Sequence, residues 1–141
     1  MGFMEIRVFD RLPPEGRQIR EEVFVREQGF QEEFDSIDSF ATHILVLVDG
    51  NPAGICRVFW DEAQKQFLLG RVAVRKTFRG LGIGAVLVRA AEKQAASMGG
   101  RALHLHAQCR ITGFYAALGY TPYGGIEDDQ GCPHIWMGKV L

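Results

Sequence analysis

A short glycine-rich segment in the middle of the chain holds the residues best suited to chemistry. It reads Arg79-Gly80-Leu81-Gly82-Ile83-Gly84 and stands before a stretch with helical periodicity. Glycines let an anion approach backbone N–H groups closely, and the start of a helix offers unpaired N–H groups with a partial positive charge. Arg75, Lys76 and Arg79 add full positive charge nearby. The segment predicts a diphosphate site; the simpler alternative is a loop whose glycines serve tight packing.

Two familiar nucleotide-binding patterns do not fit this segment. A P-loop ends in Gly-Lys-Ser/Thr, whereas Ala85 and Val86 follow Gly84. A dinucleotide-binding fold places GxGxxG directly behind its first strand, with an acidic residue about 20 positions later. Here the alternating glycines follow several predicted strands. The diphosphate therefore belongs to another class of ligand.

The elements that position the segment follow from the spacing of apolar residues, because alternation predicts strands and a period of three to four predicts helices. Strands are expected at residues 3–9, 42–48, 53–60, 67–75, 103–107, 120–123 and 134–140, and helices at 13–28, 81–98 and 111–118. Pro13 and Pro14 suit a first helical turn, and Asp49-Gly50-Asn51-Pro52 suits a hairpin. This order predicts an α+β fold with a mixed sheet covered by helices.

Composition narrows the class of protein further. A length of 141 residues suits one domain, 1–141, and 47% hydrophobic with 23% charged residues is the balance of a globular protein. The net charge of −1 gives no reason to expect nucleic acid or an anionic membrane as partner. Cys56, Cys109 and Cys132 form no CxxC pair, so neither a disulfide framework nor a metal site is expected. Without a membrane-spanning run or a signal peptide, we expect a cytoplasmic protein.

Two motifs together resemble the GNAT superfamily of N-acetyltransferases. The family signature Gln/Arg-x-x-Gly-x-Gly/Ala is matched by the segment from Arg79 to Gly84, and Phe114–Tyr120 resembles its Phe-Tyr-x-x-x-Gly-Phe segment. The order of predicted elements agrees over nearly the whole chain. The stretch Glu22–Gln28, followed by acidic residues, and the later Leu105–Gln108 resemble a small bacterial branch whose acceptors are generally undefined. The resemblance implies a mixed sheet splayed at its centre, with helices on both faces.

The resemblance also implies acetyl-CoA as the co-substrate. Backbone groups of Val72, Ala73 and Val74 would pair with the pantetheine arm as an added strand does. The N–H groups from Arg79 to Gly84 would hold the pyrophosphate, and an amide N–H at the splay would bind the thioester carbonyl oxygen. Gln108 stands where the family usually has an asparagine that contacts the cofactor, and its longer side chain makes that contact differ.

The same resemblance assigns Tyr115 as the acid that protonates the departing CoA thiolate. An alkyl ammonium has a pKa near ~10, so most acceptor amines need a base. The strand before the tyrosine has no acid but carries His104 and His106, whose imidazoles titrate near neutral pH. His106 is the candidate base. Both could equally be packed polar residues, as could His43 and His134, and a water chain to a distant carboxylate is another route.

An acidic stretch lies where members of this family build the wall of the acceptor site. Its carboxylates are those of Glu27, Glu32, Glu33, Asp35 and Asp38. Free negative charge there would attract a cationic amine. The alternative is a solvated loop, and the phenylalanines at positions 30, 34 and 40 suggest a packed lid.

The expected activity is direct transfer of an acetyl group to a primary amine, of a small molecule or a protein, in a ternary complex. An acyl-enzyme on Cys109 is disfavoured because no activating base stands beside it in the sequence. The alternative function is a CoA-binding module that senses or regulates without catalysis. The sequence leaves the acceptor open. Homodimers are common in the family, and no feature of the sequence requires one here.

Overall fold

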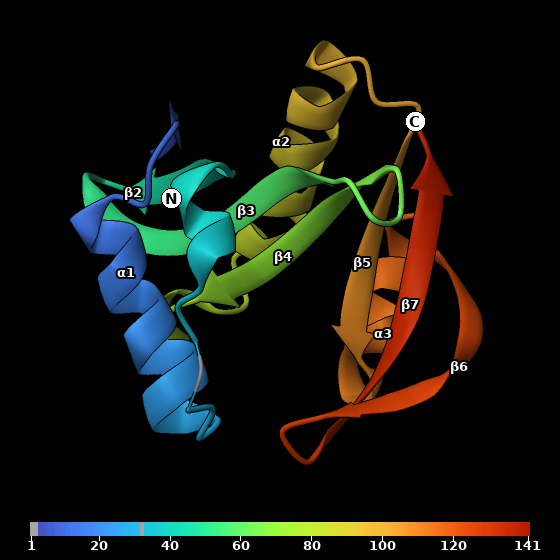
Figure 1. Ribbon diagram of the computed structural model, residues 1–141. Helices are drawn as coiled ribbons and strands as arrows, with labels where there is room; N and C mark the ends of the chain where they lie inside the picture. The colour runs from blue at the N-terminus through green and yellow to red at the C-terminus, as the bar shows by residue number, and fades with distance from the viewer. Residues whose placement is uncertain (1–2, 32) are drawn as a thin grey trace.

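The computed structural model describes residues 3–31 and 33–141. Within them, seven strands form one sheet in the order β1-β2-β3-β4-β5-β7-β6. The strands are β1 (Met4–Phe9), β2 (Thr42–Val48), β3 (Asn51–Asp61), β4 (Gln66–Val74), β5 (Ala102–Gln108), β6 (Thr121–Asp129) and β7 (Cys132–Val140). The helices are α1 (Pro14–Arg20), η1 (Glu21–Glu27), η2 (Ser36–Ser39), η3 (Lys76–Phe78), α2 (Ile83–Ser97), η4 (Cys109–Ile111) and α3 (Thr112–Ala117). Figure 1 shows the path of the chain.

Helices cover both faces of the first half of the sheet, as predicted (Figure 1). The strands β1 to β4 form an antiparallel meander. Alternation along β2 places Ile44 and Val46 in one apolar cluster with α2, and Leu45 and Leu47 in the other with α1. Burying each such side chain contributes about 1.5–3 kcal/mol. The β2–β3 turn is shorter than predicted: Asp49 and Gly50 both have positive φ, and β3 begins at Asn51.

The first helix changes its winding halfway along, which the sequence did not predict. α1 passes at Glu21 into the π-helical turn η1, where the amide of Gln28 bonds the carbonyl of Val23 at 3.2 Å. Gly29, with φ of 78°, then ends the helix as predicted. Wider π turns often occur at functional sites. Here the turn carries Phe24 and the following Phe30 to the middle of the sheet.

The sheet is splayed at its centre, between β4 and β5. In these parallel strands only Phe67–Leu69 of β4 pairs with Leu103–Leu105 of β5, and the remaining residues of the two strands diverge (Figure 1). A β-bulge bends β4 away at this point, because Ile55 pairs with Ala73 whereas Arg57 already pairs with Gly70. Arg71 in the bulge has φ of 52°, a left-handed conformation that costs a non-glycine residue roughly 1–2 kcal/mol.

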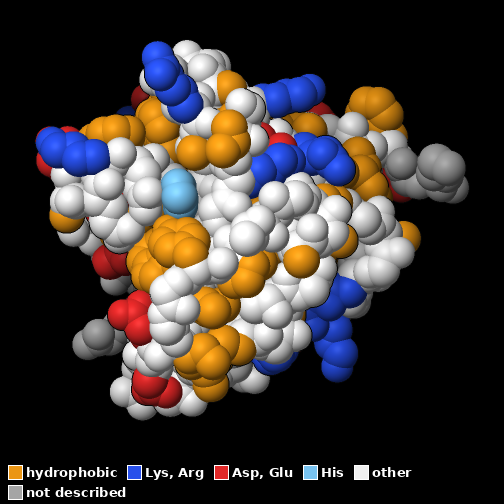
Figure 2. Space-filling view, turned by 90° about the vertical axis from the view of Figure 1, so that its right-hand side faces the viewer, with side chains coloured by type: hydrophobic (Ala, Val, Ile, Leu, Met, Phe, Trp, Pro, Cys, Tyr) orange, Lys and Arg blue, Asp and Glu red, His pale blue; other side chains and the backbone are white. Residues whose placement is uncertain are grey.

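The predicted length of the strand at 120–123 is wrong, because the observed strand β6 extends further along the chain. It runs to Asp129 because β7 offers pairing partners, although the register shifts between Tyr123 and Glu127. All of β6 is exposed. Figure 2 shows this side of the molecule, where hydrophobic side chains gather around a histidine. No helix within the described residues is long and apolar enough to cross a membrane.

Candidate functional site

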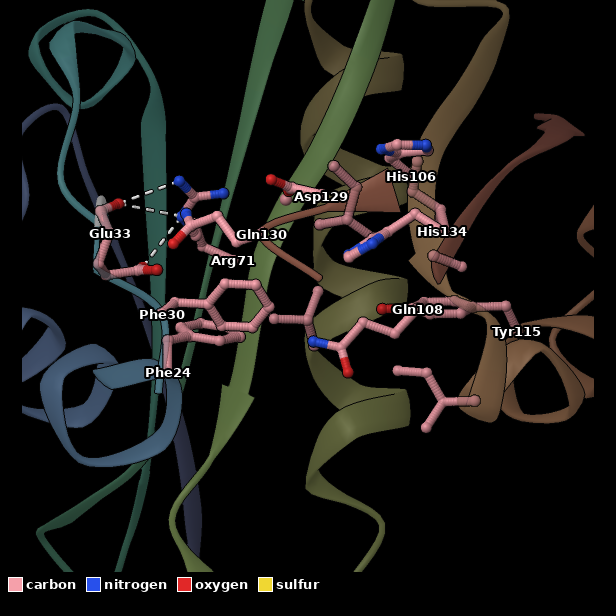
Figure 3. A pocket seen from close by; sticks show the side chains of 16 residues that line it. Phe24, Phe30, Glu33, Arg71, His106, Gln108, Tyr115, Asp129, Gln130 and His134 are labelled. Carbon is pink, nitrogen blue, oxygen red and sulfur yellow. Dashed lines mark hydrogen bonds and ion pairs between the residues drawn. The ribbon is translucent and has the colours of Figure 1, made fainter. Parts of the chain in front are cut away.

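Two cavities meet at the splay between β4 and β5. The first, which we call the inner cavity, encloses about 100 Å³ and is lined from η1, β4, β5, α3 and the β6–β7 turn (Figure 3). The second, the glycine cleft, lies between the glycine-rich turn, the end of β4 and α3. Val72, Ile111 and Tyr115 line both. The two spaces therefore adjoin at these three residues.

The glycines of the turn serve two different purposes. Gly80 and Gly82 have φ of 84° and 78°, and a Cβ built on either would meet no atom within 4 Å. Their role is conformation and open access, not packing. Gly84 differs, because a Cβ there would lie 3.1 Å from Cζ of Phe114. The packing alternative thus holds only for Gly84.

The start of α2 offers the backbone donors that the sequence predicted. Gly82 is the N-cap of α2, and no side chain caps that end of the helix. The N–H groups of the first turn consequently lack side-chain partners beside an open cleft. These features fit the diphosphate of CoA, because the left-handed glycines leave room for it and the helix start supplies donors and partial positive charge.

Arg75 and Arg79, which were expected to add positive charge near this segment, are each paired with a carboxylate. Arg75 Nε lies 3.0 Å from a carboxylate oxygen of Glu22, and an Arg79 guanidinium nitrogen lies 2.8 Å from Glu27. Arg79 Nε also donates to the carbonyl of Val74 at 3.0 Å. Both side chains therefore link the glycine-rich turn to η1. The capacity of the turn to bind an anion then lies mainly in its backbone N–H groups.

The remaining predicted cofactor residues are distributed unevenly. Val72 and Val74 line the glycine cleft, whereas the side chain of Ala73 is buried in the cluster with α1, so that only its backbone faces the splay. Leu81 is 55% exposed and lines neither cavity, whereas Ile83 lines the glycine cleft although its side chain is largely buried in the core.

Gln108 lies on the inner side of the splay. Its Nε2 donates to Oε1 of Gln28 at 2.8 Å, and its Oε1 accepts from Nε of Arg110 at 2.9 Å. Both ends of the amide are therefore engaged within the protein. A second hydrogen bond lies nearby: the backbone N–H of Gln31 donates to Gln130 Oε1 at 2.9 Å. The extra length of glutamine over asparagine is used to bridge β5 and the segment after η1.

Of the three residues that line both cavities, Tyr115 is the one whose side chain can donate a proton. The short helix α3 holds it 5% exposed, with its ring centroid 4.9 Å from that of Phe114 and 6.0 Å from that of Tyr120. Burial raises the pKa of Tyr115 well above its usual range, so the phenol keeps its proton at neutral pH. A fixed, protonated O–H at the junction of two cavities is the arrangement of a proton donor.

Two histidines lie side by side at the inner cavity, His106 on β5 and His134 on β7, with ring centroids 5.0 Å apart. His134 Nδ1 lies 2.8 Å from the carbonyl oxygen of Cys132. A carbonyl only accepts, so Nδ1 carries the hydrogen and Nε2 of a neutral ring keeps its lone pair. Figure 3 shows His134 and the Tyr115 hydroxyl pointing toward the same space.

His106, the predicted base, lies against β6 and is more exposed than His134. Its ring stacks on Trp136 with centroids 4.6 Å apart, and Nε2 lies 3.2 Å from Glu127 Oε1 without hydrogen-bond geometry. Burial and the neighbouring His134 lower the pKa of His106, although Glu127 and Asp129 oppose the shift. The imidazole is therefore neutral at pH 7.

The other two histidines lie elsewhere. His104 faces Tyr123, whose hydroxyl is 2.9 Å from Nδ1, in a surface hollow away from the splay. His43 is buried, with Nε2 3.0 Å from the carbonyl of Asp38. Neither lines the inner cavity. Among the described residues, no His, Cys, Asp or Glu side chains form a group of three or more suited to a metal ion.

The predicted acidic wall is an ion-pair network instead. Arg20 is fully buried and lies 2.8 Å from both Glu33 and Asp38. Burial raises the pKa of Glu33, which the nearby arginines only partly offset. Removing one partner from a buried network of this kind leaves an uncompensated charge and costs about 3–5 kcal/mol. Neither a free anionic patch nor a solvated loop describes this segment.

Two arginines of the sheet complete the network. Arg57 on β3 lies 2.7 Å from Asp35, and Arg71 in the bulge lies 2.9 Å from Glu33. These contacts hold Arg71 in its left-handed conformation at the wall of the inner cavity. Glu27 is paired with Arg79, and Glu32 lies outside the described residues. The sequence signal for the network was Arg57, a charge within the otherwise apolar stretch 53–60.

Comparisons with known proteins agree with this geometry. The sequence model of the Acetyltransferase (GNAT) family matches residues 6–120. An uncharacterised N-acetyltransferase of Bacillus subtilis, YjcF, is 36% identical over 124 residues, which cover 86% of this chain and 87% of that protein. A Lactobacillus plantarum crystal structure assigned as an N-acetyltransferase has a TM-score of 0.86 with 29% identity, covering 98% of both chains.

Two further structures extend the comparison. Escherichia coli ElaA has a TM-score of 0.84 with 24% identity, covering 97% of this chain and 99% of that one. A Bacillus anthracis protein assigned as a streptothricin acetyltransferase, crystallised with acetyl-CoA, has a TM-score of 0.62 with 16% identity, covering 72% of this chain and 62% of that one. At these identities the likeness concerns the fold.

Proposed function

Because the chain belongs to the GNAT acetyltransferase family and is thereby an acyltransferase, we propose that it transfers an acetyl group from acetyl-CoA directly to a primary amine. The observation that carries the proposal is the position of Tyr115, a buried phenol that lines the glycine cleft and the inner cavity at once. The donor would enter from the cleft and the amine from the cavity. The three free cysteines suit the reducing cytoplasm as the place of this reaction.

The residues of the cleft would bind the donor through the backbone. The N–H groups from Gly80 to Gly84 would hold the diphosphate, because the backbone N–H of Arg79 already donates to the carbonyl of Lys76 at 3.3 Å. The unpaired edge of β4 from Val72 to Val74 offers N–H and C=O groups to an extended arm. When bound, acetyl-CoA supplies the acetyl thioester that the amine attacks. The bulge at Arg71 turns the β4 backbone toward the splay, where an amide N–H could stabilise an oxyanion.

Tyr115 would donate the proton that the departing thiolate needs. Its raised pKa keeps the phenol protonated, and its packing against Phe114 and Tyr120 fixes the position of the hydroxyl oxygen. Aligned general acids of this kind contribute roughly 10²–10⁴-fold to rate. No covalent enzyme intermediate is needed, since amine and thioester would meet in one ternary complex.

The base would be the imidazole pair. His134 has a lone pair on Nε2 because Nδ1 donates to the Cys132 carbonyl, and it would take the proton from the acceptor ammonium. His106 stays part of the proposal as the neighbour whose ring, fixed by Trp136 and Glu127, faces His134. The sequence predicted His106 alone as the base. We now assign the base to the pair, with His134 as the member that would lie nearest to the acceptor.

The acceptor would be an amine whose reacting end is small. The inner cavity has a volume of only about 100 Å³. Phe24 and Phe30 give it an apolar wall. The ion-pair network contributes only neutralised carboxylates, whereas Asp129 also lines the cavity and forms no ion pair among the described residues. Selectivity would therefore come from this carboxylate together with the apolar walls.

The test is release of free thiol from acetyl-CoA across a panel of primary amines, with the acetylated amine identified by mass spectrometry. The proposal predicts amine-dependent thiol release that disappears when the amine is omitted. Tight acetyl-CoA binding without turnover on any small amine, protein N-terminus or lysine peptide would contradict it and favour the alternative of a CoA-binding regulatory module.

A further inference from the structure

The strand β1 is an edge of the sheet and carries an exposed apolar stripe. Met4, Ile6 and Val8 are 36%, 48% and 54% exposed, although they lie on the sheet face that packs under α2. In the register with β2 they stand opposite Val48, Val46 and Ile44. Those three partners are buried, so the apolar face continues past α2 and ends uncovered. Within the described residues, no strand pairs with the outer side of β1.

The backbone of this stripe is free to pair. The amide of Asp49 bonds the carbonyl of Phe3 at 2.8 Å, which marks Phe3 as a hydrogen-bonded position toward β2. In an antiparallel ladder these positions alternate, so Glu5 and Arg7 also bond toward β2. The N–H and C=O groups of the apolar residues between them point outward. One strand edge therefore presents both an apolar stripe and unused hydrogen-bonding groups.

The sequence of β1 is complementary to itself in the antiparallel direction. With a two-fold axis at Ile6, that residue stands opposite Ile6 of the partner subunit and Met4 stands opposite Val8 of the partner subunit. Glu5 then stands opposite Arg7 of the partner subunit, at a non-hydrogen-bonded pair, where side chains lie closest. Shifting the axis to Glu5 or to Arg7 would oppose like charges. Charge therefore selects one register.

We infer that two copies of this chain associate through β1 and form a continuous antiparallel sheet across the two-fold axis at Ile6. Within one chain, Arg7 Nε already lies 2.6 Å from Glu5, and both side chains are half exposed, so they are free to exchange partners. Standard stable interfaces bury roughly 1,200–2,000 Å², and a contact along a five-residue edge buries less than that. The dimer is therefore reversible and depends on concentration. This surface lies on the first half of the sheet and is independent of the proposed reaction.

The experiment is sedimentation velocity on the full chain over a range of concentrations, with E5R, R7E, their equimolar mixture and the double variant E5R/R7E. Each single variant opposes like charges twice across the axis, and we expect the dissociation constant of the dimer to rise at least about tenfold. The mixture of E5R with R7E restores opposite charges in the heterodimer, and the double variant restores them in the homodimer. Both are therefore expected to dimerise like the unsubstituted chain.

Unchanged thermal unfolding and unchanged acetyl-CoA affinity serve as the check that the variants fold. Three results would each overturn the inference: a chain that stays monomeric at the highest concentration, single variants that dimerise as well as the unsubstituted chain, or a mixture that stays as monomeric as its components. The mixture keeps the test decisive even if one single variant loses stability, since an unfolded component cannot restore the dimer.

Discussion

The two sides of the splay differ in what they are made of. On the donor side, the proposed binding groups are backbone N–H groups of one continuous segment that begins after Arg79 and ends at Gly84. The arginines beside it, Arg75 and Arg79, are paired with Glu22 and Glu27. On the acceptor side, the groups are side chains from η1, β4, β5, α3 and β7, separated widely in the sequence. A co-substrate common to a whole family can thus be held by the backbone of one short segment, whereas the acceptor site depends on the packing of elements that are distant in the sequence.

The largest expected effect is that of Tyr115→Phe, which tests the proposed proton donor among the residues that line both cavities. Removing the hydroxyl should lower kcat by about 10²–10⁴-fold, because the departing thiolate loses its proton donor. Steady-state kinetics with saturating substrates measure this. The matched control is Tyr120→Phe, another buried tyrosine, whose hydroxyl donates to Glu92 at 2.9 Å away from both cavities. Full activity of Tyr115→Phe at every pH would remove the acid role.

Next comes the imidazole pair on the acceptor side. His134→Gln should lower kcat by about 10²-fold, the lower end for a general base. His104→Gln is the control, because His104 lies on the same sheet face but outside the inner cavity. Equal kcat values for these two variants would exclude His134 as the base.

The pH dependence of kcat/KM tests the same pair. Burial and the neighbouring His134 lower the pKa of His106, and a cationic His106 facing His134 would oppose the uptake of a second proton by the pair. Activity should therefore fall as the pH drops through that lowered pKa and should not fall between pH 6.5 and 7.5. In His106→Gln, this acidic limb should change position. A limb that stays unchanged in both His106→Gln and His134→Gln would assign it to another group.

A smaller effect is expected for Gly82→Val on the donor side. A β-branched residue does not tolerate φ of 78°, so the turn should shift and lose one or two hydrogen bonds to the diphosphate. At about 1.5–3 kcal/mol for each charge-assisted bond, acetyl-CoA affinity should fall at least tenfold. Titration calorimetry measures this. Gly99→Val is the control, with φ of 90° just beyond the other end of α2. If Gly99→Val weakened acetyl-CoA binding as much as Gly82→Val does, the loss would not be specific to the glycine-rich turn.

The smallest expected effect is that of Arg79→Gln. The guanidinium is 43% exposed and paired with Glu27, and exposed pairs contribute only about 0–1 kcal/mol. The acetyl-CoA dissociation constant should change by less than about fivefold. A much larger loss would mean that the donor side relies on side-chain charge after all, as the sequence alone suggested.

The same contrast explains what the sequence could predict. The donor turn was predictable because glycine conformation, helix start and strand are encoded within a few neighbouring residues. Tyr115 was identified through the motif around it, and the order of strands and helices followed from periodicity. The splay was expected from the family resemblance and is visible in the short β4–β5 pairing.

What the sequence could not predict depends on contacts between distant residues. Nothing near Arg20 in the sequence shows that it will be buried between Glu33 and Asp38. The length of β6 depends on pairing with β7, because its glycines and acidic residues hide any alternation. The tautomer of His134 depends on one carbonyl two residues away, which becomes a partner only in the folded turn.

The most direct test of the account is to measure, side by side, the acetyl-CoA dissociation constant and the kcat at saturating acetyl-CoA for Gly82→Val and Tyr115→Phe. If the donor is held by backbone groups and transfer depends on side chains, Gly82→Val should raise the dissociation constant and largely preserve kcat. Tyr115→Phe should preserve the dissociation constant and lower kcat. Two variants that change the same quantity, whichever it is, would contradict the division between the two sides of the splay.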